Sequence, residues 1–203
     1  MRAFKAEGII LKRRDFGEAD RILTVFTLQR GKLLVIAKGV RRITSRRAGN
    51  VELLNRVSMF LYPGKRFWNL TEATSIDTYQ KLKEDLTLST YAFHILELTD
   101  RLTVEDQENR IFYNELVEVL ERLSKNPRQI LVRAFEARIL ANLGFVSFEK
   151  GELLGDLVTK TWDGIEKLKI NQKEAIELER TLRYYVERVI EGKLKSRQFL
   201  KKL

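Results

Sequence analysis

A short apolar run that leads straight into a basic loop is the feature that most constrains this chain. Leu33–Ala37 is an unbroken apolar run between Gly31 and Gly39, with the length and composition of a strand buried on both faces. The segment Lys38–Arg47 follows it and contains no acidic residue. Such a strand can present cations to a polyanion, and a solvated surface loop is the alternative. The loop's basic residues are Lys38, Arg41, Arg42, Arg46 and Arg47, and Thr44 and Ser45 add neutral donors.

Residue alternation and turn signals predict five short strands before residue 77. Turns are indicated at 15–18, at 29–31 and at the pair Pro63-Gly64. The longest connection lies between the third and fourth strands. This spacing fits a five-stranded OB-type barrel, with a small SH3-like barrel as the alternative. The expected strands cover residues 3–13, 22–28, 33–37, 57–62 and 67–73.

The barrel interpretation predicts where an oligonucleotide would bind. In an OB barrel, the face of the second and third strands and the loops after the first and fourth strands form the binding surface. Phe67 and Trp68 follow two cations and could stack a base beside its phosphate. Because neighbours on a strand point to opposite faces, we expect one of these aromatics to be core. The segments brought together would be Lys12-Arg13-Arg14, residues 38–47 and Lys65-Arg66-Phe67-Trp68.

Beyond Asp77 the apolar period changes from two to between three and four, which predicts helices. One helix is expected to start at Pro127 and stop at Gly144, and a last one to start at the N-cap Asn171. The lone His94 lies in an apolar helical segment, so packing or a hydrogen bond across the bundle is its expected role. The sequence therefore predicts an α+β chain of two domains, an OB-fold nucleic-acid-binding domain over 1–77 and an all-α bundle over 78–203.

The positive charge is concentrated in the first domain. The chain has a formal net charge of +10, and residues 1–80 hold 16 Lys and Arg against 7 Asp and Glu, while the rest is close to balanced. This asymmetry indicates an anionic partner for the barrel. The tail after Gly192 is also basic. It is either a helix terminus favoured by the helix dipole or a second DNA contact through Lys195 and Arg197.

No arrangement of residues typical of catalysis is evident. The chain has no cysteine and a single histidine, so we expect neither a zinc site nor any other metal or cofactor. There is no phosphate-binding Gly-Lys-Ser/Thr loop, and we expect no enzymatic activity. Asp15, Glu18 and Asp20 could suggest a metal, but salt bridging or capping is the preferred interpretation. Neither a signal peptide nor a membrane-spanning run is indicated, and we expect a cytoplasmic, nucleoid-associated protein.

Three stretches resemble the bacterial recombination mediator family RecO. Residues 7–20, from Glu7-Gly8-Ile9-Ile10 to Gly17-Glu18-Ala19-Asp20, are similar to the family's opening. Gly31-Lys32, the run Ala37-Lys38-Gly39-Val40-Arg41-Arg42 and Ser45 are similar to its basic segment. The third stretch, residues 194–200, resembles its ending and is short.

The resemblance implies an OB domain followed by a helical domain, without enzymatic turnover. It implies binding to single- and double-stranded DNA, annealing of complementary strands, and work with RecR, and in some members RecF, to help RecA replace single-strand-binding protein. The acidic tail of that protein would dock on the helical domain. Family members often carry a four-cysteine zinc module after the segment that resembles 135–146. This chain has the cysteine-free Ser147–Thr159 there.

We therefore expect Lys38, Arg41 and Arg42 to be the central phosphate contacts, with the other basic residues named above beside them and Phe67 or Trp68 stacking a base. Two rivals stay open. An RNA-binding OB module would use the same cations and stacking platform. A scaffold would use the basic patch to bind an acidic protein tail.

Overall fold

The computed structural model describes residues 2–148, 151–192 and 194–196. The chain divides into two compact units. The barrel unit contains residues 1–80 and 99–113, and the helical unit contains residues 81–98 and 114–203. The helices α2 (Leu86–Leu102) and α3 (Arg110–Lys125) contribute residues to both units.

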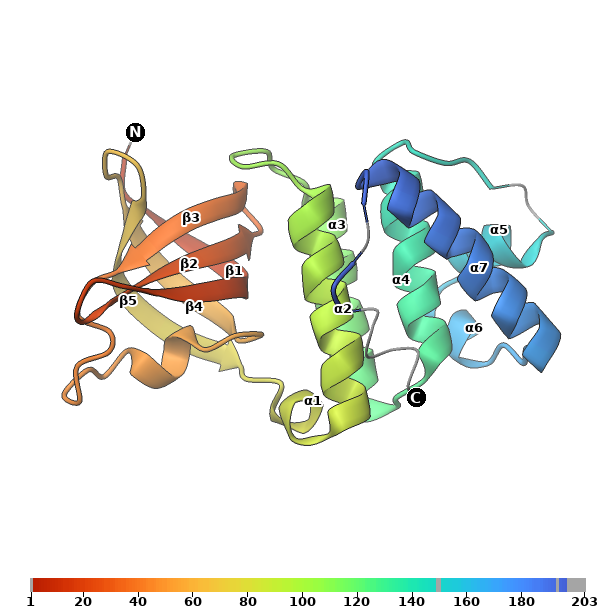
Figure 1. Ribbon diagram of the computed structural model, residues 1–203, viewed down its shortest axis with the longest axis horizontal. Helices are drawn as coiled ribbons and strands as arrows, with labels where there is room; N and C mark the ends of the chain where they lie inside the picture. Colours follow the sequence, from red (N-terminus) through yellow and green to blue (C-terminus); the bar gives the residue numbers. More distant parts are fainter. Residues whose placement is uncertain (1, 149–150, 193, 197–203) are drawn as a thin grey trace. The chain divides into compact units, whose positions relative to one another are not determined.

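Five strands close into a barrel in the order β1-β2-β3-β5-β4 (Figure 1). Neighbouring strands are antiparallel except β3 and β5, which pair in parallel at Val35 and Trp68. The predicted five-stranded OB-type barrel is confirmed. The strands are β1 (Phe4–Phe16), β2 (Asp20–Thr27), β3 (Gly31–Ala37), β4 (Arg56–Tyr62) and β5 (Trp68–Asp77).

The first turn is shorter than the sequence suggests. β1 continues to Phe16 because its residues pair with β2 as far as Phe16 and Asp20, so residues 17–19 alone make the turn. A β-bulge lies in β1 between Ile10 and Lys12, and it leaves Leu11 outside the regular register. Ile9, Ile10 and Leu11 are all buried, but only Ile10 belongs to the core cluster inside the barrel, as expected when successive side chains of a strand point to opposite faces.

Residues 103–109 cross the β2–β3 hairpin. The backbone N–H of Asp106 donates to the carbonyl of Lys32 at 2.9 Å, and the Arg30 guanidinium lies 2.8 Å from the Asp106 carboxylate. The Lys32 ammonium also donates to the carbonyl of Asp100 at 2.6 Å. These contacts hold the segment that follows α2 against the start of β3.

The rest of the described chain is helical, as the change of period predicts. None of its described helices is long and apolar enough to cross a bilayer. Asn171 caps the last helix, and its side chain forms a reciprocal capping box with Glu174. The further elements are η1 (Ala48–Val51), α1 (Gln80–Glu84), α4 (Gln129–Asn142), α5 (Leu153–Thr159), α6 (Trp162–Glu166) and α7 (Gln172–Val189).

The expected helix start at Pro127 is wrong by two residues. Arg128 keeps an extended backbone as the N-cap, and α4 begins at Gln129. The guanidinium of Arg128 donates to the carbonyl of Leu168 at 2.9 Å, a contact distant in sequence that fixes this residue outside the helix.

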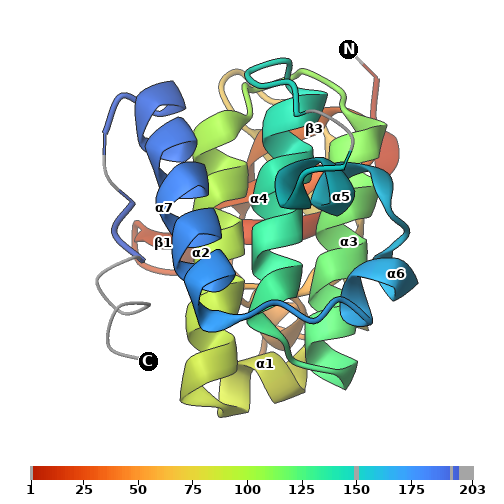
Figure 2. The same ribbon diagram turned by 90° about the vertical axis from the view of Figure 1, so that its right-hand side faces the viewer.

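Helix α4 is the centre of the helical unit and lies between α7 on one side and α5 and α6 on the other (Figure 2). Two of its charged residues are buried, Arg133 and Glu136. The Glu136 carboxylate lies 2.6 Å from Nε2 of His94 and accepts from Arg133 at 2.8 and 3.0 Å. Nδ1 of His94 lies 3.2 Å from the Ser196 hydroxyl. The prediction that His94 packs or hydrogen-bonds across the bundle is confirmed.

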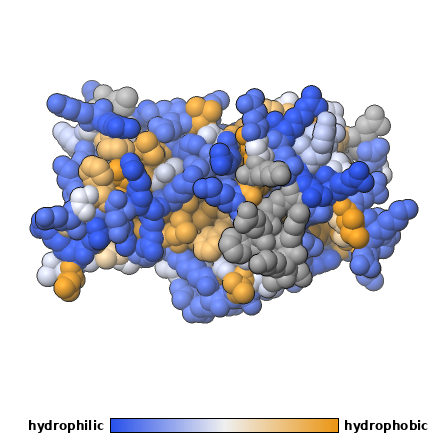
Figure 3. All heavy atoms as spheres, in the orientation of Figure 1, coloured by the Kyte–Doolittle hydropathy of each residue, from blue (hydrophilic) through white to orange (hydrophobic). Residues whose placement is uncertain are grey.

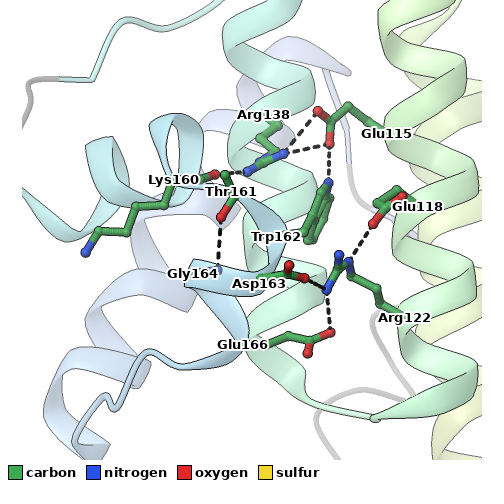
Figure 4. A network of polar contacts seen from close by, with 10 residues as sticks. All are labelled: Glu115, Glu118, Arg122, Arg138, Lys160, Thr161, Trp162, Asp163, Gly164 and Glu166. Atoms are coloured by element: carbon green, nitrogen blue, oxygen red, sulfur yellow. Dashed lines mark hydrogen bonds and ion pairs between the residues drawn. The ribbon is translucent and has the colours of Figure 1, made fainter.

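A polar network fastens α6 to α3 and α4 (Figure 4). The Arg138 guanidinium binds Glu115 at 3.0 and 3.1 Å and lies 4.4 Å from the ring of Trp162. The indole N–H of Trp162 donates to the same Glu115 carboxylate at 3.0 Å. Arg122 binds Asp163 and Glu166 at 2.7 and 3.0 Å. Polar contacts from two longer helices thus help to hold the short helix α6, together with its buried residues Trp162 and Ile165.

Candidate nucleic-acid interface

The barrel carries a surface groove of about 570 Å³. Its floor is apolar, and basic side chains of β1 meet Arg66 and Phe67 of the β4–β5 connection along it. Leu11 of β1 lies in this floor, beside side chains of β2 and β3. The lining residues are Leu11, Lys12, Arg13, Arg14, Ile22, Thr24, Leu34, Leu53, Arg66 and Phe67. Two of the three segments expected to converge thus meet in one groove, whereas residues 38–47 do not line it.

Phe67 and Arg66 form the aromatic and cationic wall of this groove. The Arg66 guanidinium lies 5.5 Å from the centre of the Phe67 ring. Phe67 is half-buried, and Lys65 and Arg66 are exposed. A half-buried ring beside a guanidinium can stack a base while the cation holds the adjacent phosphate.

Trp68 belongs to the barrel core and cannot serve as a stacking platform. Its residue is 7% exposed. The Phe4 ring packs edge-on against it at 5.0 Å, and the Arg30 guanidinium lies over it at 5.0 Å. One aromatic of the pair is therefore core, as the alternation predicts, and Phe67 is the one that reaches the groove.

A chain of ion pairs runs from the groove wall to the basic loop. Glu52 binds Arg13 and lies 3.0 Å from Arg21, and Asp15 lies 3.1 Å from Arg21 and 3.3 Å from Arg41. Burial lowers the pKa of Arg21, but its bonds to the two carboxylates raise it above its ordinary value. We call these residues, Arg13, Glu52, Arg21, Asp15 and Arg41, the ion-pair ridge.

The basic loop, residues 38–47, is held by its own hydrogen bonds. The N–H of Gly39, whose φ is +65°, donates to the Asp20 carboxylate at 2.7 Å. The Arg47 guanidinium donates to the carbonyls of Lys38 and Leu70 at 2.8 and 2.7 Å. Arg47 therefore closes the loop, and the acids Asp15 and Asp20 bind arginine and backbone as expected.

Some of the predicted DNA-binding side chains already form ion pairs with carboxylates of the protein, and others do not. Lys12 pairs with Asp100, and Arg13 and Arg41 belong to the ion-pair ridge. Among the residues that the structure describes, six of the barrel cations predicted to bind DNA are exposed and form no ion pair. These are Arg14, Lys38, Arg42, Arg46, Lys65 and Arg66.

In the helical unit, the basic tail is anchored through its backbone. The N–H groups of Lys195 and Ser196 donate to the Glu97 carboxylate, each at 2.8 Å. The Lys195 side chain is exposed, and Arg197 lies outside the described residues. No cluster of three metal-ligating side chains occurs among residues 2–148, 151–192 and 194–196.

A second groove, of about 340 Å³, lies in the helical unit between α4 and α7. Arg133 and Arg183 supply its positive charge, and Glu136, Glu179 and Glu187 its negative charge. Ile176, Val186 and Leu194 give it apolar walls.

The sequence did not predict the apolar floor of the barrel groove, nor Glu52, the residue of the ion-pair ridge that binds both Arg13 and Arg21. Leu34 and Leu53 look like ordinary apolar residues in the sequence. Glu52 lies 39 residues from Arg13 and 31 from Arg21, so no local pattern joins them. The run Ile9-Ile10-Leu11 was the available signal, because three consecutive apolar residues on a two-faced strand imply a bulge or an apolar outer surface.

Both parts of the chain match family models. Residues 1–79 match the model described as "Recombination protein O N terminal", and residues 83–147 match "Recombination protein O C terminal".

Several relatives are similar proteins named DNA repair protein RecO. One from Pelotomaculum thermopropionicum is 34% identical over 71% of this chain and 57% of its own length. Another, from Moorella thermoacetica, is 38% identical over 70% of this chain and 53% of its own. The chain spans just over half the length of these two relatives. A third, from Desulforamulus reducens, is 28% identical over all of this chain and 96% of its own length.

The two family models follow each other in the chain in the same order as the barrel and the helices that succeed it. Together with the relatives, they show that the chain belongs to the RecO family of DNA repair proteins.

Proposed function

We propose that this chain binds DNA through its barrel unit, anneals complementary strands and mediates recombination without catalysing a reaction itself. The groove carries the proposal, because it combines an apolar floor, the aromatic ring of Phe67 and the unpaired cations Arg14 and Arg66. These are the parts that single-strand-binding grooves use. RecR, single-strand-binding protein and in some settings RecF are the proposed partners, with RecA loading as the outcome, in the cytoplasm at the nucleoid.

Annealing requires that two polyanions approach each other, so charge neutralisation matters more than base readout. Arg14, Lys65 and Arg66 can contact phosphates without first breaking an ion pair. Lys12 and Arg13 would have to leave Asp100 and Glu52. We therefore assign three phosphate contacts to a single strand in the groove, fewer than the count of basic residues suggests.

Binding of a short single strand is expected to weaken with salt at a log-log slope of roughly −2, from about −0.7 per contact. Phe67→Ala should weaken the same binding by about fivefold to a hundredfold, because one stacked base contributes roughly 1–3 kcal/mol. Fluorescence anisotropy with a labelled oligonucleotide measures both. Phe60→Ala, which removes an exposed aromatic of β4 outside the groove, is the control. A slope near zero with weak affinity would contradict the assignment.

The function itself is tested by annealing of complementary strands coated with single-strand-binding protein. The wild type should accelerate annealing, and a variant with Arg14→Ala, Arg66→Ala and Phe67→Ala should lose the acceleration at equal folded concentration. A variant with Lys81→Ala, Lys125→Ala and Tyr184→Ala loses a similar set of side chains in the helical unit and should keep it. DNA binding without any acceleration by the wild type would argue against the mediator function.

That result would favour the two rivals, and further measurements separate them. Competition between matched RNA and DNA oligonucleotides identifies an RNA-binding module. Charge reversal at Arg14 and Arg66 that abolishes partner binding but not DNA binding identifies a scaffold.

A further inference from the structure

Ile43, in the middle of the basic loop, is the most exposed large apolar side chain of the described residues. Its relative exposure is 105%. Single exposed apolar residues are common on protein surfaces. Ile43, however, lies between the unpaired cations Arg42 and Arg46 in the sequence, so an anionic partner bound by these cations would also contact the apolar side chain.

The loop presents Ile43 on an ordered backbone. The N–H of Arg42 donates to the carbonyl of Gly39 at 3.2 Å, and the N–H of Ser45 donates to the carbonyl of Arg42 at 2.9 Å. Ile43 therefore lies within a turn, and Arg47 joins the two ends of the loop. Figure 1 shows the loop extending from the barrel ahead of η1, and Figure 3 shows hydrophobic residues in separate patches on a largely hydrophilic surface.

The loop is a cationic surface separate from the groove. No residue of 38–47 lines the groove. The ion-pair ridge links Arg13 at the groove wall to Arg41 in the loop, and each of its two carboxylates contacts two guanidinium groups. Its three cations are therefore largely compensated. The six unpaired cations of the predicted site fall into a groove set, Arg14, Lys65 and Arg66, and a loop set, Lys38, Arg42 and Arg46.

The two sets suit different forms of DNA. A flat aromatic ring in a groove stacks on unpaired bases. A branched aliphatic side chain on a convex, basic loop stacks poorly, but proteins that bind the minor groove of duplex DNA insert such apolar wedges between base pairs while cations hold the backbones on either side. Lys38, Arg42 and Arg46 would supply those cations.

We infer that the basic loop is a second, separate DNA site that binds double-stranded DNA, with Ile43 entering the minor groove as a wedge. The inference rests on the proposed function and deepens it. One barrel unit would hold an unpaired strand in the groove and paired DNA at the loop, which are the substrate and the product of annealing.

The test uses the full-length chain and a 30-base-pair duplex that carries 2-aminopurine in one strand. Wild-type protein should raise the 2-aminopurine fluorescence, because a wedge unstacks its neighbours. Ile43→Ser should abolish the rise and weaken duplex binding by roughly tenfold, since a buried apolar side chain is lost. Binding of single-stranded DNA should stay unchanged.

The matched control is Val104→Ser, which also removes an exposed β-branched side chain of the barrel unit, at 65% exposure. Val104 precedes Glu105, which pairs with Lys32 at the start of β3, whereas the basic loop follows the end of β3. Val104→Ser should leave both duplex binding and the fluorescence rise unchanged.

A double variant, Arg42→Ala with Arg46→Ala, should reduce the steepness of the duplex salt slope by about 1.8, from about 0.9 per contact, and leave the single-strand slope as it is. Duplex binding and fluorescence that do not respond to Ile43→Ser would overturn the wedge. Equal losses of single- and double-strand binding in the double variant would overturn the separation of sites. A wild-type protein that binds neither form would instead refute the proposed function.

Discussion

Gly31→Ala should destabilise the barrel unit by about 3–5 kcal/mol, the largest effect expected for a single added methyl group in this chain. Gly31 has a φ of +66°, a conformation that costs other residues strain. A Cβ at this position would lie 1.8 Å from the carbonyl oxygen of Gln107 and 2.6 Å from its carbonyl carbon. Both atoms are backbone, so a side-chain rotation cannot relieve the clash.

The segment of Gln107 cannot retreat without breaking other contacts. Its neighbour Asp106 is bound to Lys32 through the backbone and to Arg30 through an ion pair. Urea unfolding, with hydrogen exchange of the β2 and β3 peptides to isolate the barrel unit, measures the loss. Gly17→Ala is the control, because Gly17 also has a positive φ, +57°, but its Cβ would meet nothing within 4 Å. Equal destabilisation by both substitutions would contradict the steric argument.

The barrel was predictable because its signals are local. Each signal involves only a few neighbouring residues: the apolar run Leu33–Ala37 and the turn residues Gly31 and Pro63-Gly64. The strands β3 and β4 lie where these signals predict them. The capping box at the start of α7 is likewise a relation between residues three apart, Asn171 and Glu174.

The candidate site was less predictable, because cations look alike in a sequence. Arg41 and Arg47 share the loop with Arg42 and Arg46, yet Arg41 joins the ion-pair ridge and Arg47 binds backbone carbonyls. Their partners lie far away in the chain, and only the closed barrel brings them near. The distinction between structural and available cations is therefore a tertiary property.

The short helices α5 and α6 were missed for a related reason. They contain too few residues to show an apolar period, and Arg122 and Arg138 hold α6 from other helices. Trp162, for example, belongs to no apolar period in the sequence. It is held in the fold by the hydrogen bond from its indole N–H to Glu115 and by the Arg138 guanidinium over its ring.

Glu136→Gln should destabilise the helical unit by about 3–5 kcal/mol, because it removes the negative charge that binds the buried Arg133 guanidinium at 2.8 Å. Glu136 is 3% exposed. Its carboxylate also accepts the hydrogen bond from His94 on α2, so the substitution weakens the junction of α2 and α4.

The same carboxylate gives the stability a defined pH dependence. Burial alone would raise the pKa of Glu136, but the charge of Arg133 and the hydrogen bond and charge of His94 lower it to about 2. A carboxylate whose pKa is lower in the folded state than in the unfolded chain binds fewer protons when folded. Its contribution is therefore complete above its ordinary value of 4.5 and is lost as the pH falls toward 2.

Urea unfolding of wild type and Glu136→Gln, with hydrogen exchange of the α4 peptides to isolate the helical unit, compares the two proteins between pH 7 and pH 2. The difference in unfolding free energy should be constant from pH 7 to about pH 5 and should shrink below it, since protonation of Glu136 makes the wild type resemble the variant. Glu118→Gln removes a carboxylate that is 40% exposed and also binds an arginine, Arg122, and it should cost less than about 1 kcal/mol at every pH. A Glu136→Gln effect as small as that of Glu118→Gln would mean that Arg133 finds another partner or water, and that α4 does not depend on this buried pair.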